Sequence, residues 1–205
     1  MTTTAAATSE GVGASATTAQ TIATIDQAIA TLVVAFASDP VIRWLFPEGV
    51  RYLDYYPRLA RLSGRPAFEA GTADCAPAGV GTALWVPPGT ELPDEEFGAL
   101  IQDGVDPDRH AEAFALLEQV QAHHPEAAHW YLPFIGIDPR VQGRGHGSAL
   151  LRVGLERCDR DGLPAYLEAS SERNRALYER HGFEVTAEIR AADCPPLWPM
   201  LRPAA

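Results

Sequence analysis

The hydrophobic side chains of this chain follow two different spacings, one helical and one extended. Between residues 21 and 37, apolar positions such as Ile25, Ile29 and Leu32 recur every three to four residues and predict an amphipathic helix. Residues 130–137 instead form a short, almost continuous apolar run, which is typical of a buried strand. The two periods alternate along the chain, and this alternation predicts an α/β fold.

The same periods and the breaks between them predict the remaining elements. Helices are expected at residues 21–37, 49–62, 93–102, 107–123, 144–159 and 175–181. Strands are expected at residues 67–73, 80–86, 130–137, 164–169, 183–190 and 197–201. The first two strands would form a hairpin through Pro77-Ala78-Gly79, and residues 41–47 would form a compact aromatic turn.

The stretch after the 130–137 run carries the strongest sign of function. The run ends at Asp138-Pro139, and Gly143, Gly145 and Gly147 then stand at alternate positions before a helical pattern begins. A glycine-rich turn between a strand and a helix lets the backbone approach a ligand, and the first N–H groups of the helix have no intrahelical partner. The sequence therefore predicts a phosphate or pyrophosphate held by backbone amides.

Two common phosphate loops do not fit this stretch. A dinucleotide fingerprint, G-x-G-x-x-G, that begins at Gly143 would need a glycine where Ser148 stands. A Walker loop needs a lysine, and the chain has none, because its 16 basic residues are all arginine. The lack of lysine also excludes catalysis through a lysine Schiff base.

A third pattern does fit. The segment from Gln142 to Gly147 matches Gln/Arg-x-x-Gly-x-Gly/Ala and resembles the acyl-CoA pyrophosphate loop of the GNAT acetyltransferase superfamily. Residues 166–174 and 175–183 resemble the GNAT succession of a strand, an Asn, a short helix with a Tyr, and Gly-Phe. Residues 21–202 are also similar to the puromycin N-acetyltransferase branch, although the likeness is weak in the middle of the chain.

The resemblance implies a GNAT-like fold with an acetyl-CoA site. The fold would be a mixed, mostly antiparallel central sheet flanked by helices and splayed between the strands at 130–137 and 164–169. An edge strand usually opens this fold, but the candidate at residues 14–20 is rich in Ala and Thr and would be short or absent. The residues expected to hold acetyl-CoA are Phe134, Ile135, Gly136, Ile137, Gln142, Gly143, Arg144, Gly145, His146, Gly147, Ser148 and Asn174.

Acetyl transfer to an amine needs a neutral amine, a stabilised oxyanion and a proton for the leaving thiolate. Tyr178 matches the family's tyrosine general acid, and a phenol is protonated at neutral pH. Without the resemblance, Tyr178 would be interpreted as a packing residue. Glu168 is a candidate base if burial raises its pKa, or else a structural carboxylate. Asn174 is also a candidate N-cap of the short helix.

Two further groups of side chains are candidates for ligand contacts. Arg140, Arg144, Arg173 and Arg175 flank the loop and the short helix, and Arg144 is the first candidate for a phosphate contact because it lies inside the loop. A set of aromatic residues would line an acceptor pocket or simply form core: Trp44, Phe46, Tyr52, Tyr55, Tyr56 and Trp85.

Charge and composition limit the partners. Residues 1–137 carry 6 Arg and 17 Asp/Glu, whereas residues 138–190 carry 9 of each. The formal net charge of −11 argues against nucleic acid as a partner, and the acidic part would attract a cationic amine. No apolar run is long enough to cross a membrane, and no Cys/His spacing suits a metal. We expect a disordered tail at residues 1–19, a single domain at 20–205 and a cytoplasmic location.

The favoured function is an acetyl-CoA-dependent N-acetyltransferase that acts on a small-molecule amine. A protein or peptide N-acetyltransferase and a non-catalytic acyl-CoA-binding sensor are the alternatives. The presence of Tyr178 favours an enzyme over a sensor, and the short chain favours a small substrate. A homodimer is compatible with each of these functions.

Overall fold

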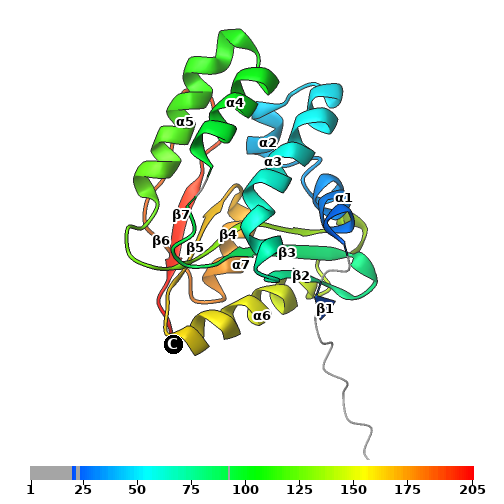
Figure 1. Ribbon diagram of the computed structural model, residues 1–205, viewed down its shortest axis with the longest axis vertical. Helices are drawn as coiled ribbons and strands as arrows, with labels where there is room; N and C mark the ends of the chain where they lie inside the picture. Colours follow the sequence, from blue (N-terminus) through cyan, green and yellow to red (C-terminus); the bar gives the residue numbers. More distant parts are fainter. Residues whose placement is uncertain (1–19, 22–23, 92) are drawn as a thin grey trace, which may run out of the picture.

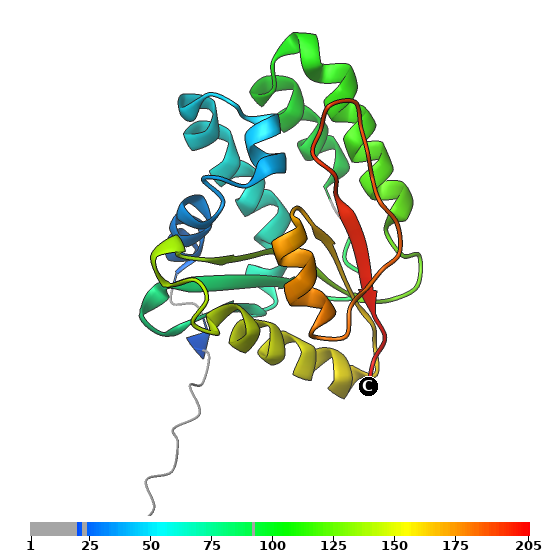
Figure 2. The same ribbon diagram turned by 180° about the vertical axis from the view of Figure 1, so that it is seen from behind.

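The computed structural model describes residues 20–21, 24–91 and 93–205. The tail predicted at residues 1–19 lies outside the described residues. The described part of the chain folds into one twisted sheet with helices on both faces (Figures 1 and 2). This mixed α/β architecture is the one that the alternating hydrophobic periods predict.

The described residues contribute seven strands to this sheet, in the order β1-β2-β3-β4-β5-β7-β6. All neighbouring strands run antiparallel except β4 and β5, which are parallel. The mostly antiparallel sheet confirms the predicted fold class. The strands are β1 (Gln20–Thr21), β2 (Ala73–Cys75), β3 (Gly81–Val86), β4 (Trp130–Ile137), β5 (Ala165–Ala169), β6 (Glu184–Val185) and β7 (Trp198–Arg202).

The two parallel strands separate after a short contact. β4 and β5 pair only at Trp130 with Ala165 and at Tyr131 with Tyr166. Beyond that point β4 pairs with β3 and β5 pairs with β7, so a gap opens between the two central strands. A register shift between β3 and β4 falls at the β4 segment that contains Pro133, which identifies this proline with a β-bulge. The predicted splay is therefore present.

Helices cover the two faces of the sheet and extend beyond one end of it. α1 and α3 pack on β3 and β4 from one side, and α6 packs on β2, β3 and β4 from the other. α4 packs on α3 and α5 on α4, at the top of Figure 1. The helices are α1 (Ile25–Ala35), α2 (Pro40–Leu45), α3 (Gly49–Glu69), α4 (Asp94–Gly104), α5 (His110–His123), α6 (His146–Asp161) and α7 (Glu172–Glu179).

Two glycines allow helices to approach the sheet closely. A Cβ at Gly154 of α6 would overlap the indole of Trp85 on β3. A Cβ at Gly136 of β4 would stand 2.7 Å from the Cβ of Ala35, so α1 packs directly on the backbone of β4. The lack of a side chain at Gly136 therefore has a packing cause, in addition to the role expected from its place beside the gap.

Three predicted elements differ from the observed ones. Residues 41–47 are not only a turn, because α2 forms there with Asp39 as its N-cap and Pro40 in its first turn. The helix predicted at 49–62 continues to Glu69, so no strand forms at 67–73, and the first hairpin strand is β2. Helical spacing of the buried residues continues through α3 despite two prolines inside it.

The two edge strands of the sheet, β1 and β6, are short. The opening edge strand is present as β1, which pairs with β2 over two residue pairs. The strand predicted at 183–190 is reduced to β6 and an isolated bridge between Ile189 and Leu197. Neither change affects the central strands, which position the candidate site.

Candidate active site

A structured loop connects β4 to α6. The carboxylate of Asp138 accepts a hydrogen bond from the backbone N–H of Arg140 at 2.9 Å and begins the short 3-10 helix η3 (Pro139–Val141). The side-chain amide of Gln142 donates to the carbonyl of Ile137 at 3.1 Å. The loop is thereby tied back to the end of β4 before the glycines begin.

The glycines then bring the chain into α6 through left-handed backbone. Gly143 has a φ of 78° and Gly145 a φ of 87°, a region that side chains disfavour. Gly145 is the N-cap of α6, and the N–H of Ala149 is bonded back to its carbonyl at 3.0 Å. The preceding N–H groups, those of residues 146–148, have no carbonyl one turn earlier in the helix. They are donors at the positive end of a 16-residue helix, which suits an anion.

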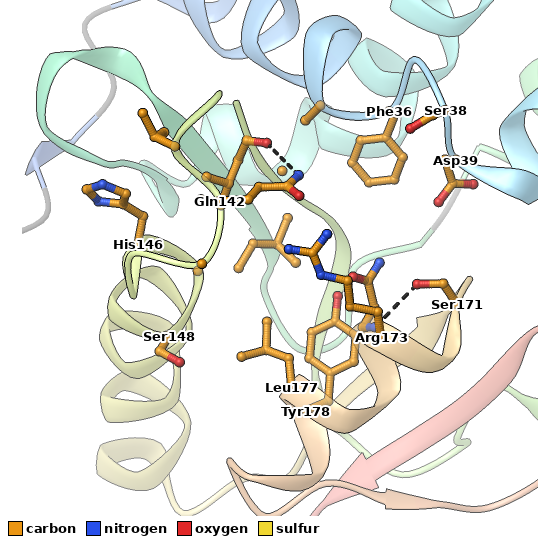
Figure 3. Close-up of a pocket in the computed structure, with 18 of the residues that line it drawn as sticks. Phe36, Ser38, Asp39, Gln142, His146, Ser148, Ser171, Arg173, Leu177 and Tyr178 are labelled. Atoms are coloured by element: carbon orange, nitrogen blue, oxygen red, sulfur yellow. Dashed lines mark hydrogen bonds between the residues drawn. The ribbon is translucent and has the colours of Figure 1, made fainter. Parts of the chain in front are cut away.

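A cavity of about 610 Å³ borders this loop (Figure 3). Its walls come from β4, the glycine loop, the start of α6, α7 and the segment between α1 and α2. The structure thus brings together β4, the glycine loop and α7, which the sequence analysis singled out separately. The predicted residues that line the cavity are Ile135, Gly136, Ile137, Gln142, Gly143, Gly145, His146, Gly147, Ser148, Asn174 and Tyr178.

The N-terminus of α7 is capped by Ser171 rather than by Asn174. The hydroxyl oxygen of Ser171 accepts from the backbone N–H of Asn174 at 3.3 Å, and the helix begins at Glu172. The interpretation of Asn174 as the N-cap is therefore wrong, because the helix starts one turn earlier than predicted. Asn174 lies inside the first turn of α7 and lines the cavity.

Tyr178 extends from α7 into the cavity, where its ring lies beside Leu177 (Figure 3). Its side chain is buried, with a relative exposure of 6%, and its ring packs edge-on against Phe183 at a centroid distance of 6.0 Å. Burial raises the pKa of the Tyr178 phenol, and the nearby charge of Asp39 raises it further. The phenol is therefore protonated and can donate a proton to a group in the cavity.

The cavity also has walls that the sequence analysis did not assign to it. Phe36, Ser38 and Asp39 contribute from the segment between α1 and α2, opposite the glycine loop in Figure 3. Arg180, the C-cap of α7, also contributes, whereas Arg173, which lines the cavity from α7, was already a candidate for a phosphate contact. The signal that was available for Asp39 is the Asp-Pro pair before an apolar turn, which can begin a helix as well as end one.

This chain is similar in sequence to known acetyltransferases. Residues 82–183 match the model of the acetyltransferase (GNAT) family. An uncharacterized N-acetyltransferase of Schizosaccharomyces pombe is 30% identical over 178 residues, which cover 77% of this chain and 69% of the relative. The chain belongs to the GNAT acetyltransferase family. It is accordingly an acyltransferase.

Solved structures share the fold over nearly the whole chain. A Corynebacterium glutamicum protein described as histone acetyltransferase HPA2 and related acetyltransferase has a TM-score of 0.65 and 26% identity, with 92% of this chain and 96% of that chain covered. Arylalkylamine N-acetyltransferase 2 of Aedes aegypti shares the fold, with a TM-score of 0.66, 14% identity and coverage of 92% and 99%.

Three of the predicted site residues lie outside the cavity lining. Phe134 is buried, and its ring packs edge-on against the rings of Phe36 and Tyr56 at 5.4 and 5.8 Å. Arg144 is exposed and does not line the cavity. The third is Glu168 on β5. Contacts of these residues with the GNAT substrates stay predictions.

The arginines near the glycine loop differ in whether they are free to contact a ligand. Arg140 forms an ion pair with Asp138 at 2.6 Å, and Arg175 lies over the ring of Trp198 and 3.4 Å from Glu179. Arg173, by contrast, lines the cavity and points into it in Figure 3. Arg173 is therefore better placed than Arg140 or Arg175 to contact a phosphate in the cavity.

Glu168 belongs to a buried cluster with Tyr131 that does not line the cavity. Its Oε2 accepts a hydrogen bond from the hydroxyl of Tyr131 at 3.0 Å, whereas its Oε1 is buried without a partner. Burial raises the pKa of Glu168 to about 7, against the opposing effect of the Tyr131 hydrogen bond. The carboxyl can therefore exchange a proton near neutral pH, which fits the predicted role as a base and leaves it a prediction.

Two histidines continue this cluster. The Nε2 atoms of His124 and His129 are 2.9 Å apart, and the His124 ring lies edge-on to Tyr131 and Tyr166, each at a centroid distance of 4.8 Å. Burial, followed by the neighbouring His129, lowers the pKa of His124 to about 4. His124 is thus neutral at physiological pH.

Most of the candidate aromatic residues are core residues. Five of them are buried and do not line the cavity: Trp44, Phe46, Tyr52, Tyr56 and Trp85. No helix among the described residues is both long and apolar enough to span a membrane. Within the same residues, no group of three His, Cys, Asp or Glu side chains is arranged to hold a metal ion.

Proposed function

We propose that this GNAT acyltransferase transfers the acetyl group of acetyl-CoA to a primary amine of a small molecule, by direct attack of the amine on the thioester. One observation carries the proposal. The open amides at the start of α6 and the phenol of Tyr178 face a single cavity beside the splayed strands (Figure 3).

The glycine loop fits the pyrophosphate of acetyl-CoA. The N–H groups of residues 146–148 are unpaired within the helix, and the helix dipole adds positive potential at the same place. A Cβ at Gly143 or Gly145 would meet no atom within 4 Å, so the space above the loop is open for a ligand. Arg173 supplies a charged side chain in the same cavity.

The gap between β4 and β5 suits the extended pantetheine arm. From Leu132 onward β4 pairs only with β3 among the described strands, so its other edge is available for backbone hydrogen bonds. Ile135, Gly136 and Ile137 from that edge line the cavity. Backbone N–H groups along this edge are the candidate donors to the acetyl oxygen as negative charge develops on it.

The chemistry then needs a proton at the leaving sulfur. The amine nitrogen attacks the carbonyl carbon, the C–S bond breaks, and the thiolate takes the phenolic proton of Tyr178. The excess proton of the attacking nitrogen restores that phenol. Because burial keeps Tyr178 neutral, it is always in the donor form at working pH.

The volume of the cavity and the proteins that share the fold favour a small amine as the acceptor. A cavity of about 610 Å³ lies within the range of small-ligand pockets. The resemblance to the puromycin N-acetyltransferase branch adds aminonucleosides to the amines worth testing. The fold is also that of enzymes described as acting on arylalkylamines and polyamines, at 14% and 15% identity.

A two-part assay tests the proposal. Calorimetry of the full chain with acetyl-CoA measures binding, and thiol release measures turnover with a panel of monoamines, diamines, aminonucleosides and peptides with free N-termini. We expect binding, together with turnover of at least one small amine. Turnover of peptides alone would support a peptide N-acetyltransferase, and binding without any turnover would support a sensor. Lack of acetyl-CoA binding would overturn the proposal.

A further inference from the structure

The acceptor side of the cavity contains an unusual carboxylate. Among the described residues that line the cavity, Asp39 is the only acidic one, and it lies across the cavity from the glycine loop (Figure 3). Arg173, Arg180 and His146 are the basic residues of the same lining. The lining thus combines three basic residues, which suit phosphates, with one carboxylate, which favours a positive charge.

Asp39 is held in position from two directions. Its Oδ1 caps α2 by accepting the backbone N–H groups of Val41 at 3.1 Å and Ile42 at 3.0 Å. Its Oδ2 accepts the hydroxyl of Ser170, which directly follows β5. The carboxylate is therefore fixed between α2 and the end of a central strand, beside the gap where the acetyl group would lie.

Among the residues that the structure describes, the carboxylate of Asp39 has no cationic partner. The side chain is 9% exposed, and no ion pair found among the described residues includes it. Burial raises the pKa of its carboxyl, while the hydrogen bonds from Ser170, Ile42 and Val41 oppose that rise. A buried carboxylate without a counter-ion is costly, and a bound ammonium group would remove that cost.

We infer that Asp39 binds the ammonium group of the acceptor amine and receives its first proton. The inference rests on the proposed function and adds that the preferred acceptors are amines that are cationic at neutral pH. The ammonium passes one proton to the Asp39 carboxylate, and the neutral amine then attacks the thioester. After transfer, Asp39 returns that proton to water, while Tyr178 supplies the proton of the released thiol.

The variant Asp39→Asn tests this role with little disturbance of the fold. The amide oxygen of Asn can still cap α2, since Asn is as good an N-cap as Asp, and the amide can still bond Ser170. A purely structural Asp39 therefore predicts nearly unchanged activity. Loss of a buried charge partner predicts that kcat/KM for an aliphatic amine falls by about 30-fold or more.

Asp106→Asn is the matched control, because Asp106 is also an N-cap whose Oδ1 accepts the N–H two residues ahead, at 3.0 Å, but lies outside the cavity lining. We expect no change in its kcat/KM. In Asp39→Asn, an aromatic amine, which is neutral at pH 7, should lose less activity than an aliphatic amine. Acetyl-CoA affinity by calorimetry should remain at the wild-type level.

The outcomes separate the two claims. Active wild-type enzyme with unchanged kcat/KM for aliphatic amines in Asp39→Asn overturns the role of Asp39 and leaves the proposed function intact. Equal losses for aliphatic and aromatic amines also overturn it, because a structural change would lower both. Wild-type protein without acetyl-CoA binding or thiol release overturns the proposed function itself.

Discussion

Gly145 and Gly162 stand at the two ends of α6 in the same backbone conformation. Their φ angles are 87° and 65°, and a Cβ at either position would meet no atom within 4 Å. An alanine at either site would thus be opposed by backbone strain and not by lack of space. The two positions differ in their neighbours, because Gly145 lines the cavity and Gly162 does not.

Gly162 therefore provides a control that separates an effect on ligand binding at the glycine loop from an effect on stability. We expect Gly145→Ala to weaken acetyl-CoA binding, because relief of the strained φ angle would reorient the first amides of α6. Both substitutions should lower the free energy of unfolding by about 1 kcal/mol. Gly162→Ala, however, should leave the acetyl-CoA affinity unchanged. Calorimetry with acetyl-CoA and denaturant unfolding of both variants decide the matter. Equal affinities in the two variants would exclude the loop as the pyrophosphate site.

Tyr178→Phe should separate catalysis from binding. The change removes one hydroxyl and keeps the buried ring beside Phe183, so the fold and the acetyl-CoA affinity should persist. Loss of the general acid should lower kcat by about 10²–10⁴-fold. Tyr56→Phe is the control, since it removes another buried hydroxyl, one without a hydrogen-bond partner and outside the cavity lining. A kcat for Tyr178→Phe close to that of the control would make Tyr178 a packing residue.

The elements nearest the cofactor loop could be predicted from the sequence because their signals are local. The apolar run at residues 130–137 has the bounds of β4, and the glycines give both the turn and the start of α6. Such signals depend on neighbouring residues and on backbone conformations that glycine favours. The same holds for Tyr178, which a motif of a few residues places on α7.

Asp39 was missed because its importance depends on contacts between distant segments. The sequence predicts a helix at residues 21–37 and a turn at 41–47, which leaves Asp39 in the connection between them, whereas in the structure Asp39 and Pro40 begin α2. The partner Ser170 is 131 residues away, and no local pattern connects the two. Similarly, the continuation of α3 through Pro66 depends on packing of its buried face, which outweighs the helix-breaking tendency of proline.

The cluster around Glu168 makes stability depend on pH. Its pKa is raised from 4.5 to about 7, so the folded protein holds a proton that the unfolded chain loses, and stability falls as pH rises between these values. Relative to Glu168→Gln, the wild type should lose up to about 3 kcal/mol over this window. Denaturant unfolding at several pH values measures the difference. Glu156→Gln, at an exposed position of α6, is the control and should follow the wild type.

His124 should produce the opposite dependence. Its pKa is lowered from 6.5 to about 4, so the unfolded chain gains a proton first as pH falls, and stability is lost between these values on acidification. Because the imidazole is only partly buried, we expect the effect to be about 1–2 kcal/mol. His124→Gln should remove this loss, whereas His123→Gln, at the exposed neighbouring position, should keep it.

The two opposed effects overlap between pH 4.5 and 6.5, so the wild type should show a weaker pH dependence there than either single variant. Glu168→Gln should leave stability rising with pH, and His124→Gln should leave it falling. The double variant should again be nearly flat. Because the two side chains share Tyr131 as a neighbour, a double-mutant cycle also measures their coupling. Slopes of the same sign in both single variants would show that the cluster does not titrate as its burial requires.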